Sequence, residues 1–161
     1  DRYINDAKIA EALAQMLNRV GIEASVETMP KAVYFKRASR GGPNKSPEFS
    51  FMLLGWGAGS GEASSPLKAL LHTYDKSKGL GAANRGRHSD AEVDKLVQKA
   101  LATVDADARG ALLAKATERA VGVNYGVIPM HYQVNTWAAK KGYSYLPRTD
   151  ERTIVTGLSG G

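Results

Sequence analysis

The sequence contains no cysteine. This absence excludes disulfide bonds, thiolate metal sites and a cysteine nucleophile. No apolar run approaches the roughly 18 residues that a membrane-spanning helix needs, so we expect no direct membrane insertion. The first residues are polar and lead directly into a helical pattern, which does not fit a signal peptide. From these features alone we expect either a cytoplasmic protein or a piece of a longer one.

The sequence also lacks the spacings by which common catalytic sites are recognised. The serines of the 60–65 loop form no Gly-x-Ser-x-Gly elbow, and His72 follows only a few residues later, which disfavours a hydrolase. His72, His88 and His131 share no metal-ligand spacing such as His-x-x-x-His. The alternate glycines of the 55–61 loop lack both the dinucleotide fingerprint and a phosphate-loop Lys-Ser/Thr. We therefore predict no enzyme, no catalytic residue, no metal and no cofactor.

Basic residues are not concentrated in any one tract. The chain has 22 Lys and Arg against 16 Asp and Glu, a formal net charge of +6. Such a charge can indicate a nucleic-acid partner, but its even spread argues against one, and we expect none. One alternative stays open: a stand-alone interaction domain that binds an anionic partner, such as nucleic acid, through the basic loops Lys36 to Lys45 and Lys76 to Arg87.

Helical and strand patterns alternate along a chain whose size suits one folded domain. The chain has 161 residues, of which 43% are hydrophobic and 24% charged, near the globular average. Amphipathic spacing and caps predict helices over 6–20, 30–39, from 65 to about 71, after a capping box at 89–92, and after Asp105 or Asp107, the last two as an antiparallel pair. Strand patterns cover 22–26, 49–54 and 127–130.

The most distinctive stretch runs from Phe49 to Pro66. It begins as an apolar strand and ends in a Gly/Ser loop that carries Trp56. Because ligands of α/β proteins bind beyond the carboxyl ends of strands, Trp56 and the loop after it form the main site hypothesis; ordinary core is the alternative for Trp56. The loop offers open backbone, an indole face and one carboxylate, Glu62, which suits capture of a polar small molecule better than bond-making. Asn84-Arg85-Gly86-Arg87 could add donors to the same rim, with solvated loop charge as the commoner alternative.

A series of short motifs occurs in order over nearly the whole chain. These are the helix 5–12 followed by Gly21-Ile22-Glu23, the apolar strand into Gly55-Trp56-Gly57, Asn84 before the capped helix with Val93-Asp94, the helix start from Asp105 to Arg109, and Ile128-Pro129-Met130-His131. In this order they resemble the carboxyl-terminal lobe of family-five extracellular solute-binding proteins, the dipeptide, oligopeptide and nickel receptors of ABC importers.

The resemblance implies a two-lobed receptor that is exported to the periplasm, closes on its ligand and passes it to ABC permease subunits. Residues 1–133 would form part of the carboxyl-terminal lobe, and 134–161 would be a tail that returns to a first lobe outside this chain. The implied fold is α/β, a mixed sheet flanked by helices, as in lobe II of a type II periplasmic-binding-protein-like fold. The implied function is binding of peptides or related small polar solutes without catalysis.

The side chains and open backbone of this region predict its roles in ligand binding. Trp56 would wall the ligand, Gly57 to Ser60 (with Ala58 and Gly59) would offer backbone hydrogen bonds, and Glu62 and Asn84 would add polar contacts. In peptide-binding relatives this loop holds an aspartate that pairs with the peptide ammonium, and Gly59 occupies the matching position. A buried ammonium needs a carboxylate partner, so either Glu62 substitutes or the ligand lacks an ammonium.

Overall fold

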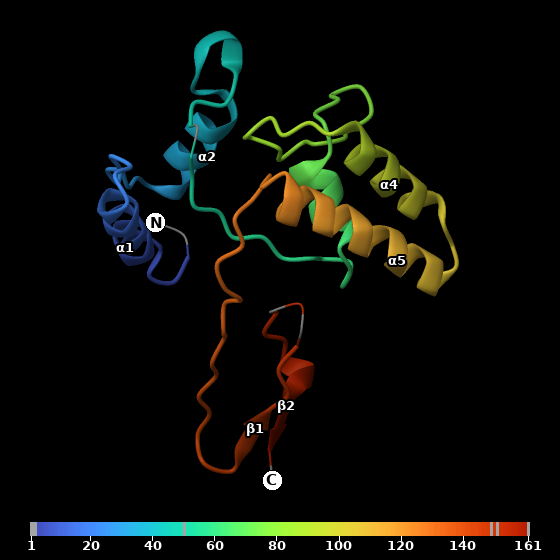
Figure 1. The fold of residues 1–161 in the computed structure, drawn as a ribbon. Helices are drawn as coiled ribbons and strands as arrows, with labels where there is room; N and C mark the ends of the chain where they lie inside the picture. The colour runs from blue at the N-terminus through green and yellow to red at the C-terminus, as the bar shows by residue number, and fades with distance from the viewer. Residues whose placement is uncertain (1–2, 50, 149, 151, 161) are drawn as a thin grey trace.

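The computed structural model describes residues 3–49, 51–148, 150 and 152–160. Helices predominate in this part of the chain (Figure 1). In order, the elements are α1 (Asp6–Arg19), α2 (Lys31–Arg40), the 3-10 turn η1 (Pro43–Lys45), α3 (Ser64–Pro66) with its π-helical continuation η2 (Leu67–Leu71), α4 (Ala91–Ala102), α5 (Ala106–Thr117) with its π-helical continuation η3 (Glu118–Val123), β1 (Tyr143–Tyr145), the 3-10 turn η4 (Val155–Gly157) and β2 (Leu158–Gly160).

The predicted α/β fold with a mixed sheet flanked by helices is wrong. The described residues are mainly helical, and their one sheet is the antiparallel pair β1–β2, in which Tyr143 faces Gly160. The segments 22–26, 51–54 and 127–130, expected as strands, run as irregular chain without forming a ladder with one another; residue 50 lies outside the described residues. A strand pattern becomes a strand only where a neighbour supplies the ladder hydrogen bonds and side-chain contacts.

The hydrophobic core lies between α4, α5 and the α3–η2 turn. The predicted antiparallel pairing of α4 and α5 is confirmed, because Arg119, just beyond α5, donates from Nη2 to Asp90 at the start of α4 at 2.8 Å. The two helices lie side by side in Figure 1. Small and branched side chains fill the space between these elements: Leu67, Leu71, Val93, Val97, Ala100, Leu113, Ala116 and Ala120.

Aspartates cap both core helices. Asp90 Oδ1 accepts from the backbone N–H groups of Glu92 and Val93, each at 2.9 Å, so Asp90 caps α4 in place of the expected Ser89. Of the two caps considered for α5, Asp105 is the one used: its Oδ1 accepts from the Ala108 N–H at 2.8 Å. Each cap satisfies N–H groups that the first helical turn leaves unpaired.

The first forty residues contribute little to this core. The predicted helix over 6–20 is confirmed as α1, but α1 buries no residue, and α2 buries only Ala38. On the apolar side of α1, Met16 is 59% exposed, and Val20, directly after the helix, is 73% exposed. This part of the chain therefore carries apolar surface that the described residues do not cover.

The tail, 134–161, ends in a hairpin that projects away from the helices (Figure 1). The sequence shows no shared face for its aromatic residues, yet the hairpin brings two of them together. The Trp137 and Tyr145 ring centroids lie 5.5 Å apart, and Trp137 Nε1 donates to Thr153 Oγ1 at 2.9 Å. These contacts hold the hairpin; the tail's expected docking on a first lobe stays a prediction.

Candidate functional site around Trp56

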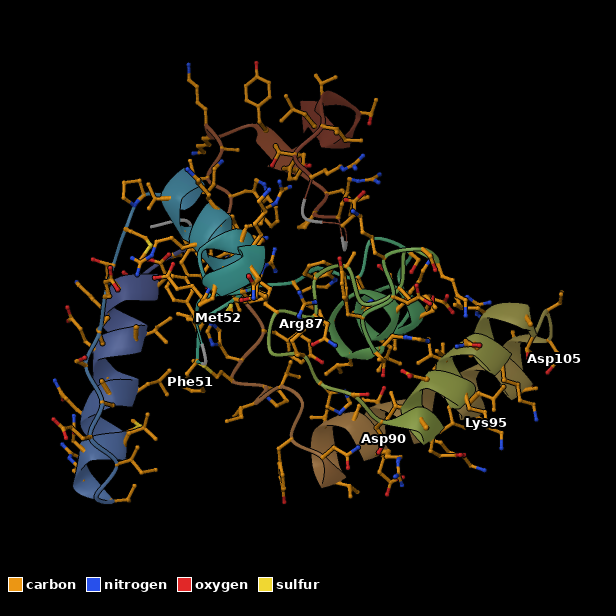
Figure 2. All side chains as sticks on the ribbon, turned by 90° about the horizontal axis from the view of Figure 1, so that it is seen from above. Phe51, Met52, Arg87, Asp90, Lys95 and Asp105 are labelled. Atoms are coloured by element: carbon orange, nitrogen blue, oxygen red, sulfur yellow. The ribbon has the colours of Figure 1, made fainter. Side chains whose placement is uncertain are left out.

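Trp56 lines a pocket of about 320 Å³ and is 45% exposed, so it is not part of the core. Four parts of the chain meet here: Tyr3 before α1, the 54–57 segment, α2 and the loop that carries Arg85. Figure 2 shows Phe51 and Met52 on the segment beside α2, and Arg87 on the loop. The lining is mostly aromatic and basic: Tyr3, Lys31, Phe35, Leu54, Gly55, Trp56, Gly57 and Arg85.

Two tyrosines fix the backbone that leads to Trp56. The hydroxyl of Tyr34 donates to the Leu53 carbonyl at 2.7 Å, and the hydroxyl of Tyr3 donates to the Gly55 carbonyl at 3.0 Å. Burial raises the pKa of Tyr34 above its ordinary value, which keeps the donor protonated. A Cβ on Gly55 would lie 2.6 Å from Tyr3 Cε1, so only glycine allows the ring to rest on this backbone.

Asn84 is buried, and its side-chain hydrogen bonds hold the loop that carries Arg85. Its side chain is 3% exposed, and its Nδ2 donates to the carbonyls of His72 at 3.0 Å and His88 at 2.7 Å. Its Oδ1 accepts from the His88 N–H at 2.9 Å. With these atoms engaged, Asn84 does not line the pocket, but it fixes the backbone next to Arg85.

Arg85 reaches from this loop across to α2. Its Nε donates to Ser39 Oγ at 3.3 Å, and its guanidinium carbon lies 5.4 Å from the centroid of the Phe35 ring. Its Nη1 is shielded from solvent and has no hydrogen-bond partner among the described residues. Lys31, at the first position of α2, lines the same pocket, whose described lining contains no acidic side chain. Among the residues that the structure describes, the positive charge of the pocket therefore has no acidic counterpart in its lining.

The loop after Trp56 is open on its backbone side. A Cβ on Gly57 or Gly59 would meet no atom within 4 Å. Ala58 lies in a turn closed by a hydrogen bond from the Gly61 N–H to its carbonyl at 2.8 Å, and Ser60 Oγ donates to the Glu62 carbonyl at 3.4 Å. Of the residues from 57 to 60, the pocket lining includes only Gly57; the others lie on the exposed turn beside it.

Glu62 is engaged elsewhere. Arg109 of α5 donates from Nε to Glu62 Oε2 at 2.8 Å and from Nη2 to Oε1, which also accepts from the Ser64 hydroxyl. These hydrogen bonds, Arg109 first and Ser64 second, lower the pKa of Glu62 to about 2. Glu62 lines a separate, shallow groove of about 730 Å³ along α5. Its carboxylate is therefore paired within the chain and is not presented to the Trp56 pocket.

His72 is a core residue. It is 3% exposed, its Nδ1 lies 2.8 Å from the Thr73 carbonyl oxygen and 3.3 Å from Asp94 Oδ1, and its Nε2 lies 3.0 Å from Gln98 Nε2. Both ring nitrogens therefore face structural partners. Within the described ranges, no cluster of three His, Cys, Asp or Glu side chains suits a metal ion. No helix in that part of the chain is long and apolar enough to cross a membrane.

Several cations of the two basic loops have partners within the chain. Arg37 pairs with Glu27 and with Glu48, both at 2.5 Å. In the second loop, Lys78 Nζ lies 3.6 Å from Asp75 Oδ2. The Arg87 guanidinium carbon lies 4.1 Å from the centroid of the Tyr74 ring. Local pairing reduces the positive field that these loops present to an outside partner.

Of the residues predicted to bind ligand, the pocket brings together Trp56 and Gly57. Arg85, which the sequence offers as a possible rim donor, also lines the pocket. Arg85 follows Asn84 directly, which is a local signal for it. Tyr3, Lys31 and Phe35 lie far away along the chain and meet Trp56 only through the fold.

No protein-family model matches this chain, and neither a curated protein nor a solved structure does.

Proposed function

We propose that this chain is part of the solute-binding component of an ABC importer and forms one wall of a cleft that binds a peptide or related small polar solute without catalysis. The observation that carries this proposal is the pocket at Trp56. It combines a half-exposed indole, open backbone at Gly57 and polar side chains from two other elements. Apolar walls with a few convergent polar groups are typical of small-molecule sites.

The uncovered apolar surface supports the same proposal. Val20, Ile22 and Val26 are 73%, 54% and 36% exposed, and Ile128 and Val134 are 66% and 78% exposed. These residues lie on or beside segments whose strand patterns find no ladder partner among the described residues. A further part of a larger receptor would cover them, and the cleft would lie between that part and Trp56. The ordered motifs that resemble family-five receptors add to this argument.

On this proposal the working protein is exported to the periplasm and delivers its solute to ABC permease subunits. It needs no cofactor, no metal and no nucleic-acid partner. This chain by itself offers one wall of the cleft, so we expect it to bind peptides more weakly than about 1 μM, because closure cannot bury the ligand from both sides. A micromolar or tighter peptide complex with this chain alone would contradict that expectation.

The test is to purify the full-length gene product under mild conditions and identify retained small molecules by mass spectrometry of the intact complex and of its denatured extract. The proposal expects a peptide or small polar solute that is released on denaturation. A Trp56→Ala variant purified in parallel should retain less of it. Catalytic turnover of the retained molecule, or failure of peptides and polar solutes to bind at millimolar concentration, would overturn the proposal.

The alternative, a stand-alone domain that binds nucleic acid through its basic loops, makes a different prediction. Such a domain would be retained on heparin or DNA, and its affinity would fall steeply as salt rises. The partners already engaged by Arg37 and Arg87 weaken this alternative. We therefore expect elution from heparin at low salt, and no further loss of retention in Lys76→Gln.

A further inference from the structure

The Trp56 pocket contains an unbalanced charge. Two of its lining side chains are cationic, Lys31 and Arg85, and no acidic side chain of the described residues lines it. Neither cation forms an ion pair with a described residue: Arg85 donates only to a serine hydroxyl, and its Nη1 has no acceptor although it is shielded from solvent. Because Nη1 is shielded from the pocket as well as from solvent, the positive charge of the guanidinium as a whole, not this N–H group, is what acts on a ligand in the pocket.

Among the described residues, the surroundings of the pocket offer no free carboxylate to an ammonium group. Gly59, in the turn after Trp56, provides no carboxylate. Glu62, the carboxylate of the same loop, is held by Arg109 and Ser64 and lines another groove. An ammonium in the pocket would face two like charges without a carboxylate partner, which is strongly unfavourable away from water.

Aromatic side chains line the pocket and help to fix the position of its arginine. Trp56 and Phe35 line the pocket from different elements, and the Arg85 guanidinium lies over the Phe35 ring at 5.4 Å. This contact and the side-chain hydrogen bonds of Asn84 fix the Arg85 guanidinium before any ligand arrives. Because Nε donates to Ser39 and Nη1 is shielded, a carboxylate in the pocket would be attracted by the positive charge of this fixed guanidinium rather than by two parallel hydrogen bonds.

We propose, on the basis of the proposed solute-binding function, that the Trp56 pocket selects small organic carboxylates that lack a free ammonium group, such as peptides with a blocked amino terminus. Arg85 binds the carboxylate, Lys31 adds a second positive charge, and Trp56 and Phe35 contact the adjoining apolar or planar part of the ligand. The pocket thereby discriminates against amines by charge rather than by size.

The test uses one dipeptide in four forms: unmodified, N-acetylated, C-amidated, and capped at both ends. Calorimetric titration of the full-length gene product should rank the N-acetylated form tightest and the C-amidated form weakest. We expect the N-acetylated acid to bind about tenfold or more tighter than its doubly capped amide, since hydrogen bonds to a charged group are the stronger kind. Arg85→Gln should reduce this preference to about threefold or less, and Lys31→Gln should reduce it in part.

Two controls separate charge recognition from loss of structure. Affinity of Arg85→Gln for the doubly capped dipeptide should stay within about twofold of the parent value, because a merely structural role of Arg85 would weaken all four ligands alike. Lys76→Gln removes one exposed positive charge from the same loop outside the pocket and should leave the ranking unchanged.

The outcomes distinguish the two proposals. If the C-amidated form binds as tightly as the N-acetylated form, or if Arg85→Gln leaves the preference intact, the charge selection is overturned while solute binding stands. If none of the four forms binds, peptide binding itself fails and the inference fails with it.

Discussion

Arg109 fastens the loop that follows Trp56 to helix α5 by donating to both carboxylate oxygens of Glu62. This pair connects the candidate site to the helical core, and it makes the loop sensitive to acid. The pKa of Glu62 is lowered from 4.5 to about 2 in the folded chain, first by Arg109 and then by Ser64. A depressed carboxyl pKa stabilises the fold above the unfolded-state pKa, and this contribution is lost as the pH falls through the folded-state pKa.

Glu62→Gln should therefore make the chain less sensitive to acid. Between about pH 5 and pH 2, the free energy of unfolding of the parent chain should fall more than that of the variant, because only the parent has the Glu62 carboxylate to protonate. Urea titrations at several pH values measure this difference. Glu23→Gln, which removes an exposed carboxylate outside the loop, should keep the parent's acid sensitivity. Equal acid sensitivity of parent and Glu62→Gln would contradict this account of the pair.

Truncating a side chain in the helical core should lower the free energy of unfolding much more than truncating one on α1. Leu71 is 4% exposed between the core helices, and Leu71→Ala should lower the free energy of unfolding by about 2–5 kcal/mol. Met16 is 59% exposed on α1, and Met16→Ala should change it by no more than about 0.5 kcal/mol in this chain. Denaturant unfolding of both variants tests this contrast.

The same two variants also test the proposal that another part of a larger receptor covers the exposed apolar residues of α1. In the full-length gene product, a partner that covers α1 would increase the destabilisation caused by Met16→Ala well beyond its value in this chain. A cost that stays small in both settings would show that the apolar face of α1 is exposed in the working protein.

Two glycines provide a matched test of the open backbone. Neither Gly57 nor Gly59 has an atom within 4 Å of an added Cβ, so alanine fits both positions and should leave the melting temperature unchanged. Gly57 lines the pocket and Gly59 does not. Gly57→Ala should weaken solute binding by about tenfold because the methyl group occupies ligand space, whereas Gly59→Ala should have a smaller effect. Equal effects on affinity would place the ligand elsewhere on the loop.

The sequence predicts the helices well because the signals that define them are local. Aspartates at helix starts and apolar residues at helical spacing identify α1, α4 and α5, although Asp90 rather than Ser89 caps α4. The sheet could not be predicted in this way, because a strand depends on a ladder partner that its own residues do not specify. The apolar run into Trp56 illustrates this: its carbonyls accept from Tyr34 and Tyr3 rather than from a neighbouring strand.

The candidate site shows the same contrast between local signals and contacts with distant residues. Trp56 and Gly57 are visible in the sequence because an aromatic residue among glycines is a local signal. Glu62 looks like a ligand contact until its distant partner Arg109 is known, and Asn84 looks like a rim donor until it is found buried against His72 and His88. Arg85 gains its role only by meeting Phe35 from α2.

The most direct test of the central claim is calorimetric titration of the full-length gene product and its Trp56→Ala variant with the retained solute. Trp137→Phe is the control, because Trp137 lies in the tail, where it contacts Tyr145 of the hairpin, and outside the pocket. We predict that Trp56→Ala weakens binding by about 1 kcal/mol or more while the control binds like the parent. An affinity unchanged by Trp56→Ala would contradict the assignment of this pocket as the solute site.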